Sequence, residues 1–139
     1  MIRVHTCLPL PIPAADVWQR IGGFSALADW HPGVLSSPLL PGDPARRRVT
    51  LADGAEIIEH CTARDEAARS YHYTLVSGPL PVQDYSAALT VRETGVFDCR
   101  VDWSAGFRPQ AGVDGAALAD RLCGVFSAGL CGAAAFLRR

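Results

Sequence analysis

The sequence contains no lysine, so all 13 of its permanently positive side chains are arginines. Without a lysine amine, Schiff-base chemistry is excluded. The arginines are balanced by 14 acidic residues, which gives a formal net charge of −1. A nearly neutral chain has no general electrostatic attraction to nucleic acid or to an anionic membrane surface. We therefore expect no nucleic-acid partner.

Long apolar runs are also missing: no stretch approaches about 18 consecutive apolar residues, so we expect no membrane span. Residues 1–5 lack the basic and then apolar pattern of a secretory signal. The five cysteines are odd in number and contain no C-x-x-C pair, which argues against a disulfide framework or a metal cluster. We expect a cytoplasmic protein with reduced thiols, no metal and no cofactor.

The 139 residues, of which 49% are hydrophobic and 19% charged, suit a single globular domain over residues 1–139. Seven segments separated by turn signals predict strands, and apolar and polar residues alternate in residues 2–8, weakly, and in residues 69–76, 85–91 and 97–107. The segments are residues 2–8, 34–40, 46–51, 55–63, 69–76, 85–91 and 97–107. The last one alternates most clearly, as an antiparallel strand with one wet face does.

Two other segments show helical spacing. In residues 16–27, Gly22-Gly23 interrupts an apolar face, which predicts two short helices. Pro32 disfavours helical geometry at His31, so this region should end there. Residues 113–137 predict one long amphipathic helix whose three glycines each cost about 1 kcal/mol relative to alanine. These glycines indicate a close approach to the sheet or to a ligand, or simply tight packing.

Together these elements predict an α+β fold. We expect a seven-stranded curved antiparallel sheet around a long C-terminal helix, with two short helices after the first strand. Because one helix cannot fill the whole concave face, a cavity should remain between the sheet and the helix.

The order and spacing of these pieces resemble the START-like helix-grip superfamily (SRPBCC), and within it the polyketide cyclase/dehydrase and lipid-transport group. The resemblance rests on Val17-Trp18, Ile21-Gly22, Phe24, Trp30-His31-Pro32, residues 50–54, Glu59, Tyr71-x-Tyr73, residues 77–82, Tyr85, Trp103-Ser104 and Phe126-x-x-Gly129-Leu130. It implies a deep, mostly apolar cavity that holds lipids, polyketides, hormones or other hydrophobic small molecules. Some members catalyse cyclisation or dehydration there, and many only bind.

The resemblance, which extends distantly to plant abscisic-acid receptors, also implies site residues. His31 falls where those receptors hold a ligand carboxylate with a lysine, and Glu59 where they have a pocket carboxylate. Residues 52–54 and 79–81 fall at their two entrance loops. Because His31 replaces that lysine, hormone-receptor function is not carried over. The ligand-binding residues expected from the resemblance are Trp30, Val34, Tyr71, Tyr73, Leu75, Leu80, Tyr85, Trp103, Leu122, Phe126 and Gly129.

Two function classes remain open on the sequence. In one, the protein binds a hydrophobic or polyketide-like small molecule without chemistry. In the other, Glu59 and His31 act as acid and base for cyclisation or dehydration of a carbonyl-rich substrate, with tyrosine hydroxyls binding an enolate. A regulatory module with gating loops is a third possibility. The sequence leaves open whether the protein is a monomer or a homodimer.

Three further expectations concern which way side chains face. Ile57 and Ile58 are adjacent, so alternation leaves the facing of Glu59 open. The Arg46-Arg47-Arg48 run is interpreted as a solvated strand edge. His60 and His72 are expected to be exposed.

Overall fold

The computed structural model describes all residues, 1–139, as eight strands and three helices. In chain order the elements are β1 (Ile2–Leu10), α1 (Ala14–Ile21), α2 (Leu27–Trp30), β2 (Val34–Ser36), β3 (Leu39–Leu40), β4 (Asp43–Leu51), β5 (Glu56–Asp65), β6 (Ser70–Ser77), β7 (Val82–Gly95), β8 (Asp98–Pro109) and α3 (Gly115–Leu137). The two predicted short helices and the predicted long helix are present, and α2 ends at Trp30, immediately before His31.

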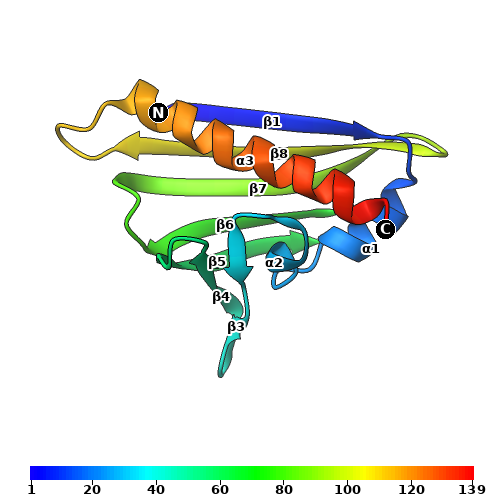
Figure 1. Ribbon diagram of the computed structural model, residues 1–139, viewed down its shortest axis with the longest axis horizontal. Helices are drawn as coiled ribbons and strands as arrows, with labels where there is room; N and C mark the ends of the chain where they lie inside the picture. Colours follow the sequence, from blue (N-terminus) through cyan, green and yellow to red (C-terminus); the bar gives the residue numbers. More distant parts are fainter.

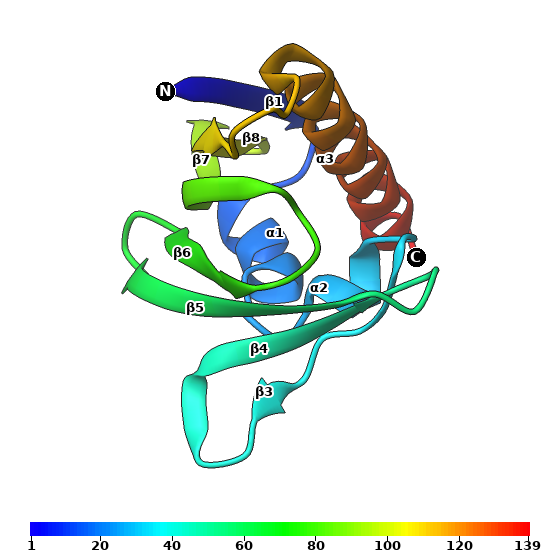
Figure 2. The ribbon, with the colours of Figure 1, turned by 90° about the vertical axis from the view of Figure 1, so that its left-hand side faces the viewer.

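The strands form one antiparallel sheet in the order β1-β8-β7-β6-β5-β4-β2, with β3 also paired to β4. The sheet curves strongly, and α3 crosses its open side from β1 towards α2 (Figures 1 and 2). This arrangement is the helix-grip fold that the sequence predicted.

The number of strands was predicted incorrectly, because residues 34–40 form two short strands instead of one. Pro38 has no N–H to donate to a ladder, and Ser37 turns inward. The Ser37 hydroxyl accepts a hydrogen bond from the Ala28 amide and donates one to the Ser25 carbonyl. The break therefore ties Ser37 to α2, while the Pro38 carbonyl still accepts a hydrogen bond from the Arg48 amide of β4.

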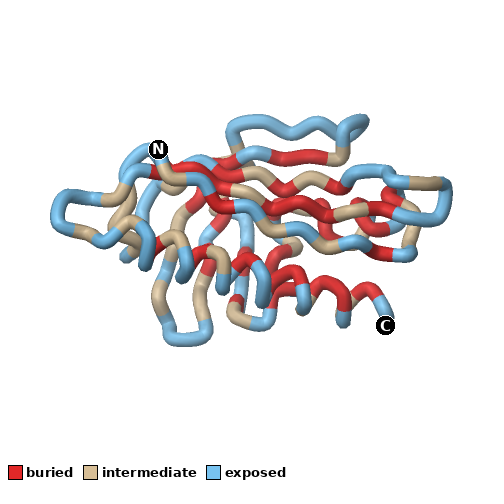
Figure 3. The backbone as a smooth tube through the Cα atoms, turned by 90° about the horizontal axis from the view of Figure 1, so that it is seen from above, coloured by how far each residue is buried: buried red, intermediate tan, exposed pale blue.

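One continuous cluster of 29 buried apolar residues forms the core between the concave face and the helices. Buried residues alternate with more exposed ones along β7, whereas β8 is buried over most of its length (Figure 3). At the far end of α3, the Arg20 guanidinium donates to the last carbonyls of the helix, those of Phe136 and Leu137. These contacts fix α3 against α1.

α3 is also long and apolar enough, by length and composition, to cross a membrane. A core helix of a globular protein meets the same two criteria, and here α3 packs against β1, β8 and α2. Its length is therefore explained by the width of the sheet it covers.

Candidate functional site

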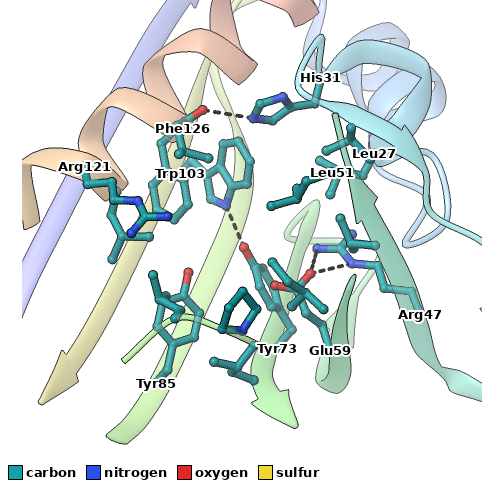
Figure 4. A pocket seen from close by; sticks show the side chains of 18 residues that line it. Leu27, His31, Arg47, Leu51, Glu59, Tyr73, Tyr85, Trp103, Arg121 and Phe126 are labelled. Carbon is teal, nitrogen blue, oxygen red and sulfur yellow. Dashed lines mark hydrogen bonds and ion pairs between the residues drawn. The ribbon is translucent and has the colours of Figure 1, made fainter. Parts of the chain in front are cut away.

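A mostly apolar cavity of about 130 Å³ lies between the concave face and α3 (Figure 4). Hydrophobic residues make up 13 of its 18 lining residues. The predicted site residues that line it are His31, Val34, Glu59, Tyr73, Leu75, Leu80, Tyr85, Trp103, Leu122 and Phe126. Elements far apart in sequence thus meet around one space, although the roles of these residues in binding or catalysis stay predictions.

Three predicted ligand-binding residues lie behind the wall instead of on it. Trp30 packs edge-on against Trp103, with ring centroids 5.4 Å apart. Tyr71 is fully buried against Phe24. Gly129 has no side chain, and a Cβ there would lie 2.6 Å from His31 Cδ2 and 2.7 Å from Trp103 Cζ3. These residues support the wall, and Gly129 lets α3 approach it.

The sequence interpretation missed eight lining residues, which are Leu27, Arg47, Val49, Leu51, Ile57, Pro79, Arg121 and Val125, and Arg47 is the buried charged residue among them. It was assigned to a solvated edge, but its side chain is 0% exposed and lines the cavity. Residues two apart in a strand share a face, and Arg47 shares the inner face of β4 with the buried Val49. Strict alternation from Val49 would have predicted this inward direction.

The Arg47 guanidinium is bound on several sides. Its Nε and Nη2 atoms lie 2.9 Å and 2.8 Å from Glu59 Oε1, and Nη1 donates to the Phe24 carbonyl at 2.8 Å. The guanidinium carbon lies 4.1 Å from the centroid of the Phe24 ring and 4.9 Å from that of Tyr73. Burial opposes the positive charge, but the Glu59 carboxylate and the tyrosines outweigh it and raise the pKa of Arg47. Arg47 therefore stays charged inside the protein.

Glu59 faces the cavity, which resolves the direction that alternation left open. Its backbone pairs with Arg47 across β4 and β5, so both side chains emerge on the same face. Both Arg47 contacts are to Oε1, and no side chain or backbone N–H of the protein bonds to Oε2. Glu59 is 9% exposed. One carboxylate oxygen is therefore held by Arg47 while the other is free to accept a hydrogen bond from a ligand.

Tyr73 lies next to Glu59 in the cavity, and Tyr85 lies on the other side of Tyr73 (Figure 4). The Tyr73 hydroxyl accepts a hydrogen bond from Trp103 Nε1 at 3.0 Å, so its own proton remains available for donation. Burial raises the pKa of both Tyr73 and Tyr85 well above the ordinary value, and neighbouring negative groups act in the same direction. Both are hydrogen-bond donors at neutral pH.

His31 makes two hydrogen bonds with the backbone. Nε2 donates to the Val125 carbonyl of α3 at 2.9 Å, and Nδ1 accepts from the Gly33 amide at 3.0 Å. These partners require the neutral Nε2–H tautomer. Burial lowers the pKa of His31, with the Val125 bond opposing it in part. His31 therefore links the segment after α2 to α3, and neither ring nitrogen is free for a ligand.

The cavity opens between α3 and the loop at residues 78–81. Its exposed lining residues are Pro79, Arg121 and Val125, which mark the mouth. The other predicted entrance loop, residues 52–54, does not itself line the cavity, although its neighbours Leu51 and Ile57 do.

Of the two histidines expected to be exposed, His72 is exposed and His60 is only half-buried. His60 lies between its register partners Arg46 and Thr74 on neighbouring strands, and its Nδ1 has no hydrogen-bond partner. Neither histidine belongs to the cavity.

Comparison with solved structures places this architecture among close relatives. The protein XoxI from Bacillus cereus shares 33% identity with a TM-score of 0.92, covering 99% of this chain and 96% of that one. A putative uncharacterized protein from Bacillus thuringiensis also shares 33% identity, with a TM-score of 0.90 and coverage of 98% and 99%. No curated protein sequence matches the chain.

More distant structures show the fold alone. They include the Zhui aromatase/cyclase from Streptomyces sp. R1128, at 14% identity, a TM-score of 0.75 and coverage of 98% and 90%. Norcoclaurine synthase from Thalictrum flavum, in complex with dopamine and hydroxybenzaldehyde, has 19% identity, a TM-score of 0.72 and coverage of 98% and 86%.

A family model described as polyketide cyclase / dehydrase and lipid transport matches residues 1–135. This match, over nearly the whole chain, agrees with the curved sheet, the long gripping helix and the cavity between them. The chain belongs to the polyketide cyclase/dehydrase and lipid transport family.

Proposed function

We propose that this protein binds a small hydrophobic molecule in the cavity between the sheet and α3. The observation that carries the proposal is a mostly apolar cavity whose few polar groups converge at its inner end. Small-molecule sites have this form, since apolar walls give affinity and a few placed polar groups give orientation. The complex of norcoclaurine synthase with two small aromatic molecules supports the proposal at the level of the fold.

A second candidate is catalysis in the same cavity, as a cyclase or dehydratase. The free Oε2 of Glu59, in the same cavity as Tyr73 and Tyr85, favours it. Glu59 would take a proton from the carbon next to a substrate carbonyl, and a tyrosine hydroxyl would stabilise the enolate oxygen. The sequence paired Glu59 with His31 for this chemistry. Because both ring nitrogens of His31 are bound to the backbone, we assign proton transfer to Glu59 and give His31 the role of holding α3.

Native mass spectrometry of freshly purified protein tests binding. We expect a co-purified mass in the wild type that is lost in Leu75→Trp, because the larger side chain fills the cavity that Leu75 lines. Val76→Trp is the matched control, since Val76 is 44% exposed on the same strand and lies outside the cavity. Equal masses in all three proteins would reject the proposal, and so would the absence of any co-purified mass together with no binding of added small aromatic probes.

The same ligand separates a carrier from an enzyme. After extraction it is incubated with excess fresh protein and analysed again by mass. A dehydratase returns the ligand without one molecule of water, and Glu59→Gln should slow this loss by about 100-fold. A carrier returns the ligand unchanged.

A further inference from the structure

Arg121 is a cation at the mouth of the cavity with no partner in the protein. It lies on the cavity-facing side of α3, one residue before Leu122 and one turn before Val125 and Phe126, which also line the cavity. No carboxylate forms an ion pair with it, and no hydrogen bond engages its guanidinium. In Figure 4 its guanidinium lies across the cavity from Glu59.

The inner end of the cavity, unlike the mouth, offers hydrogen-bonding groups and no unpaired positive charge. Glu59 Oε2 is an unused acceptor, and the Tyr73 hydroxyl has a proton to donate. The positive charge nearby is already neutralised, because the Arg47 side chain is 0% exposed and forms an ion pair with Glu59, although its Nη2 makes no hydrogen bond. A ligand carboxylate placed here would meet the Glu59 carboxylate, whereas a hydroxyl would find both an acceptor and a donor.

The net charge of the lining residues predicts the sign of the charge on the ligand. Arg47 and Arg121 carry two positive charges and Glu59 one negative charge, so the lining is positive by one charge. A ligand with a single carboxylate neutralises it, and that carboxylate has an unpaired guanidinium available only at the mouth. A guanidinium binds a carboxylate through two parallel hydrogen bonds when geometry permits.

The volume limits the size of the ligand. A cavity of about 150 Å³ in another protein binds benzene. The present cavity of about 130 Å³, with a mouth into which a substituent can project, suits one ring or a short chain. A fused multi-ring polyketide would not fit.

We propose that the ligand is a single-ring carboxylic acid with a hydroxyl at the end opposite its carboxylate. This proposal rests on the proposed function. The hydroxyl enters first and bonds to Glu59 Oε2 and the tyrosine hydroxyls. The ring lies among Leu75, Trp103 and Phe126, and the carboxylate remains at the mouth on Arg121.

Calorimetric titration with four matched probes tests this ligand class. The probes are 4-hydroxyphenylacetate, phenylacetate, 4-hydroxyphenylethanol and ethylbenzene, which carry both groups, only the carboxylate, only the phenol and neither. We expect 4-hydroxyphenylacetate to bind most tightly. Loss of the phenol should weaken binding about tenfold, because a hydrogen bond to a charged group is lost. Loss of the carboxylate should weaken it about three- to fivefold, because the pair with Arg121 is exposed.

Arg121→Gln is the main variant, since Arg121 is exposed and its replacement leaves the core unchanged. It should remove the advantage of 4-hydroxyphenylacetate over 4-hydroxyphenylethanol. Arg138→Gln is the control, because Arg138 is also exposed but lies at the far end of α3 and outside the cavity. Tyr85→Phe should weaken only the two phenols.

Three outcomes would overturn this inference and leave the proposed function standing. The first is equal binding of all four probes, and the second is a carboxylate preference that persists in Arg121→Gln. The third is no binding of any probe while native mass spectrometry shows a larger co-purified ligand. If no probe binds and no mass co-purifies, the proposed function itself fails.

Discussion

The Arg47 guanidinium is held by one carboxylate oxygen, one backbone carbonyl and the faces of neighbouring aromatic rings. Removing a charge from water is costly unless its partners replace the lost hydration. Here Nε and Nη1 are hydrogen-bonded, Nη2 has only the charge contact with Glu59 Oε1, and Glu59 Oε2 is left free. The pair therefore presents a fixed, negatively charged acceptor to an otherwise apolar space, which is the feature that distinguishes this cavity from a simple void.

Breaking this pair should destabilise the fold more than removing it entirely. Arg47→Met leaves the Glu59 carboxylate buried without a partner, so we expect the free energy of unfolding to fall by about 3–5 kcal/mol. Urea denaturation followed by far-UV circular dichroism measures this loss. The double variant Arg47→Met/Glu59→Leu should recover most of it, because both charges are gone.

The control is Arg48→Met, since Arg48 is exposed on the opposite face of β4. Its effect should stay within about 0.5 kcal/mol. A loss for Arg47→Met as small as that of the control would contradict the assigned burial of the pair.

His31 should make stability depend on pH on the acidic side. Its pKa in the folded protein is lowered from the ordinary value of 6.5, so the unfolded chain binds a proton more readily. The contribution is present above about pH 6.5 and is lost as the pH falls towards the folded pKa. Between about pH 7.5 and pH 5.5 the wild type should lose more of its free energy of unfolding than His31→Gln does.

Urea denaturation at the two pH values measures this difference. His72→Gln, at an exposed position, should keep the pH dependence of the wild type. If His31→Gln also keeps it, His31 is not the group responsible.

At the scale of elements, α3 depends on two glycines that let it approach the segment after α2. A Cβ at Gly129 would lie 2.6 Å from His31, and one at Gly132 would collide with the Trp30 carbonyl and Pro32. A Cβ at Gly124 would meet nothing within 4 Å. The same residue type thus has different roles along one helix, and the sequence interpretation of close approach holds for two of the three glycines.

Alanine substitutions should separate these roles. Gly129→Ala should lower the free energy of unfolding by about 1–3 kcal/mol, because overpacking exceeds the gain in helix propensity. Gly124→Ala should raise it by about 0.5–1 kcal/mol through propensity alone. Chemical denaturation checks both values, and a stabilising Gly129→Ala would show that α3 does not need this close approach.

At the scale of the whole molecule, the mouth lies between α3 and the loop at residues 78–81. Ligand binding should reduce amide exchange in this loop and at the cavity-facing turns of α3, since loops beside a pocket often gate it. The comparison uses hydrogen exchange with and without saturating 4-hydroxyphenylacetate. The sequence also predicts protection at residues 52–54, whose neighbours Leu51 and Ile57 line the cavity.

The hairpin tip between β7 and β8 is the internal reference for this experiment. It contains the exposed Val96 and Phe97 and does not line the cavity. Protection confined to that tip would contradict the position of the mouth.

The sequence by itself determined the class of fold and most of the cavity wall. Alternation in the strands and the change to helical spacing after Phe107 report local geometry, which neighbouring residues in the chain specify. Tyr73, Tyr85 and Trp103 therefore lie on the predicted concave face, and α3 begins within two residues of its expected start. The break at Pro38 was also visible in the sequence as a residue that cannot donate to a ladder, but the extra strand was missed.

Only the tertiary structure decided how the polar residues are used. The inward direction of Glu59 and its pairing with Arg47 depend on the register between β4 and β5. The sequence pattern could not predict this direction, because the adjacent Ile57 and Ile58 break the alternation. The hydrogen bond of His31 Nε2 depends on the carbonyl of Val125, which is 94 residues away in the chain. It also depends on Gly129, where the absence of a Cβ leaves room for the imidazole. Local patterns place side chains on faces, but contacts across the core fix which atoms remain free, and those free atoms decide what the cavity can bind.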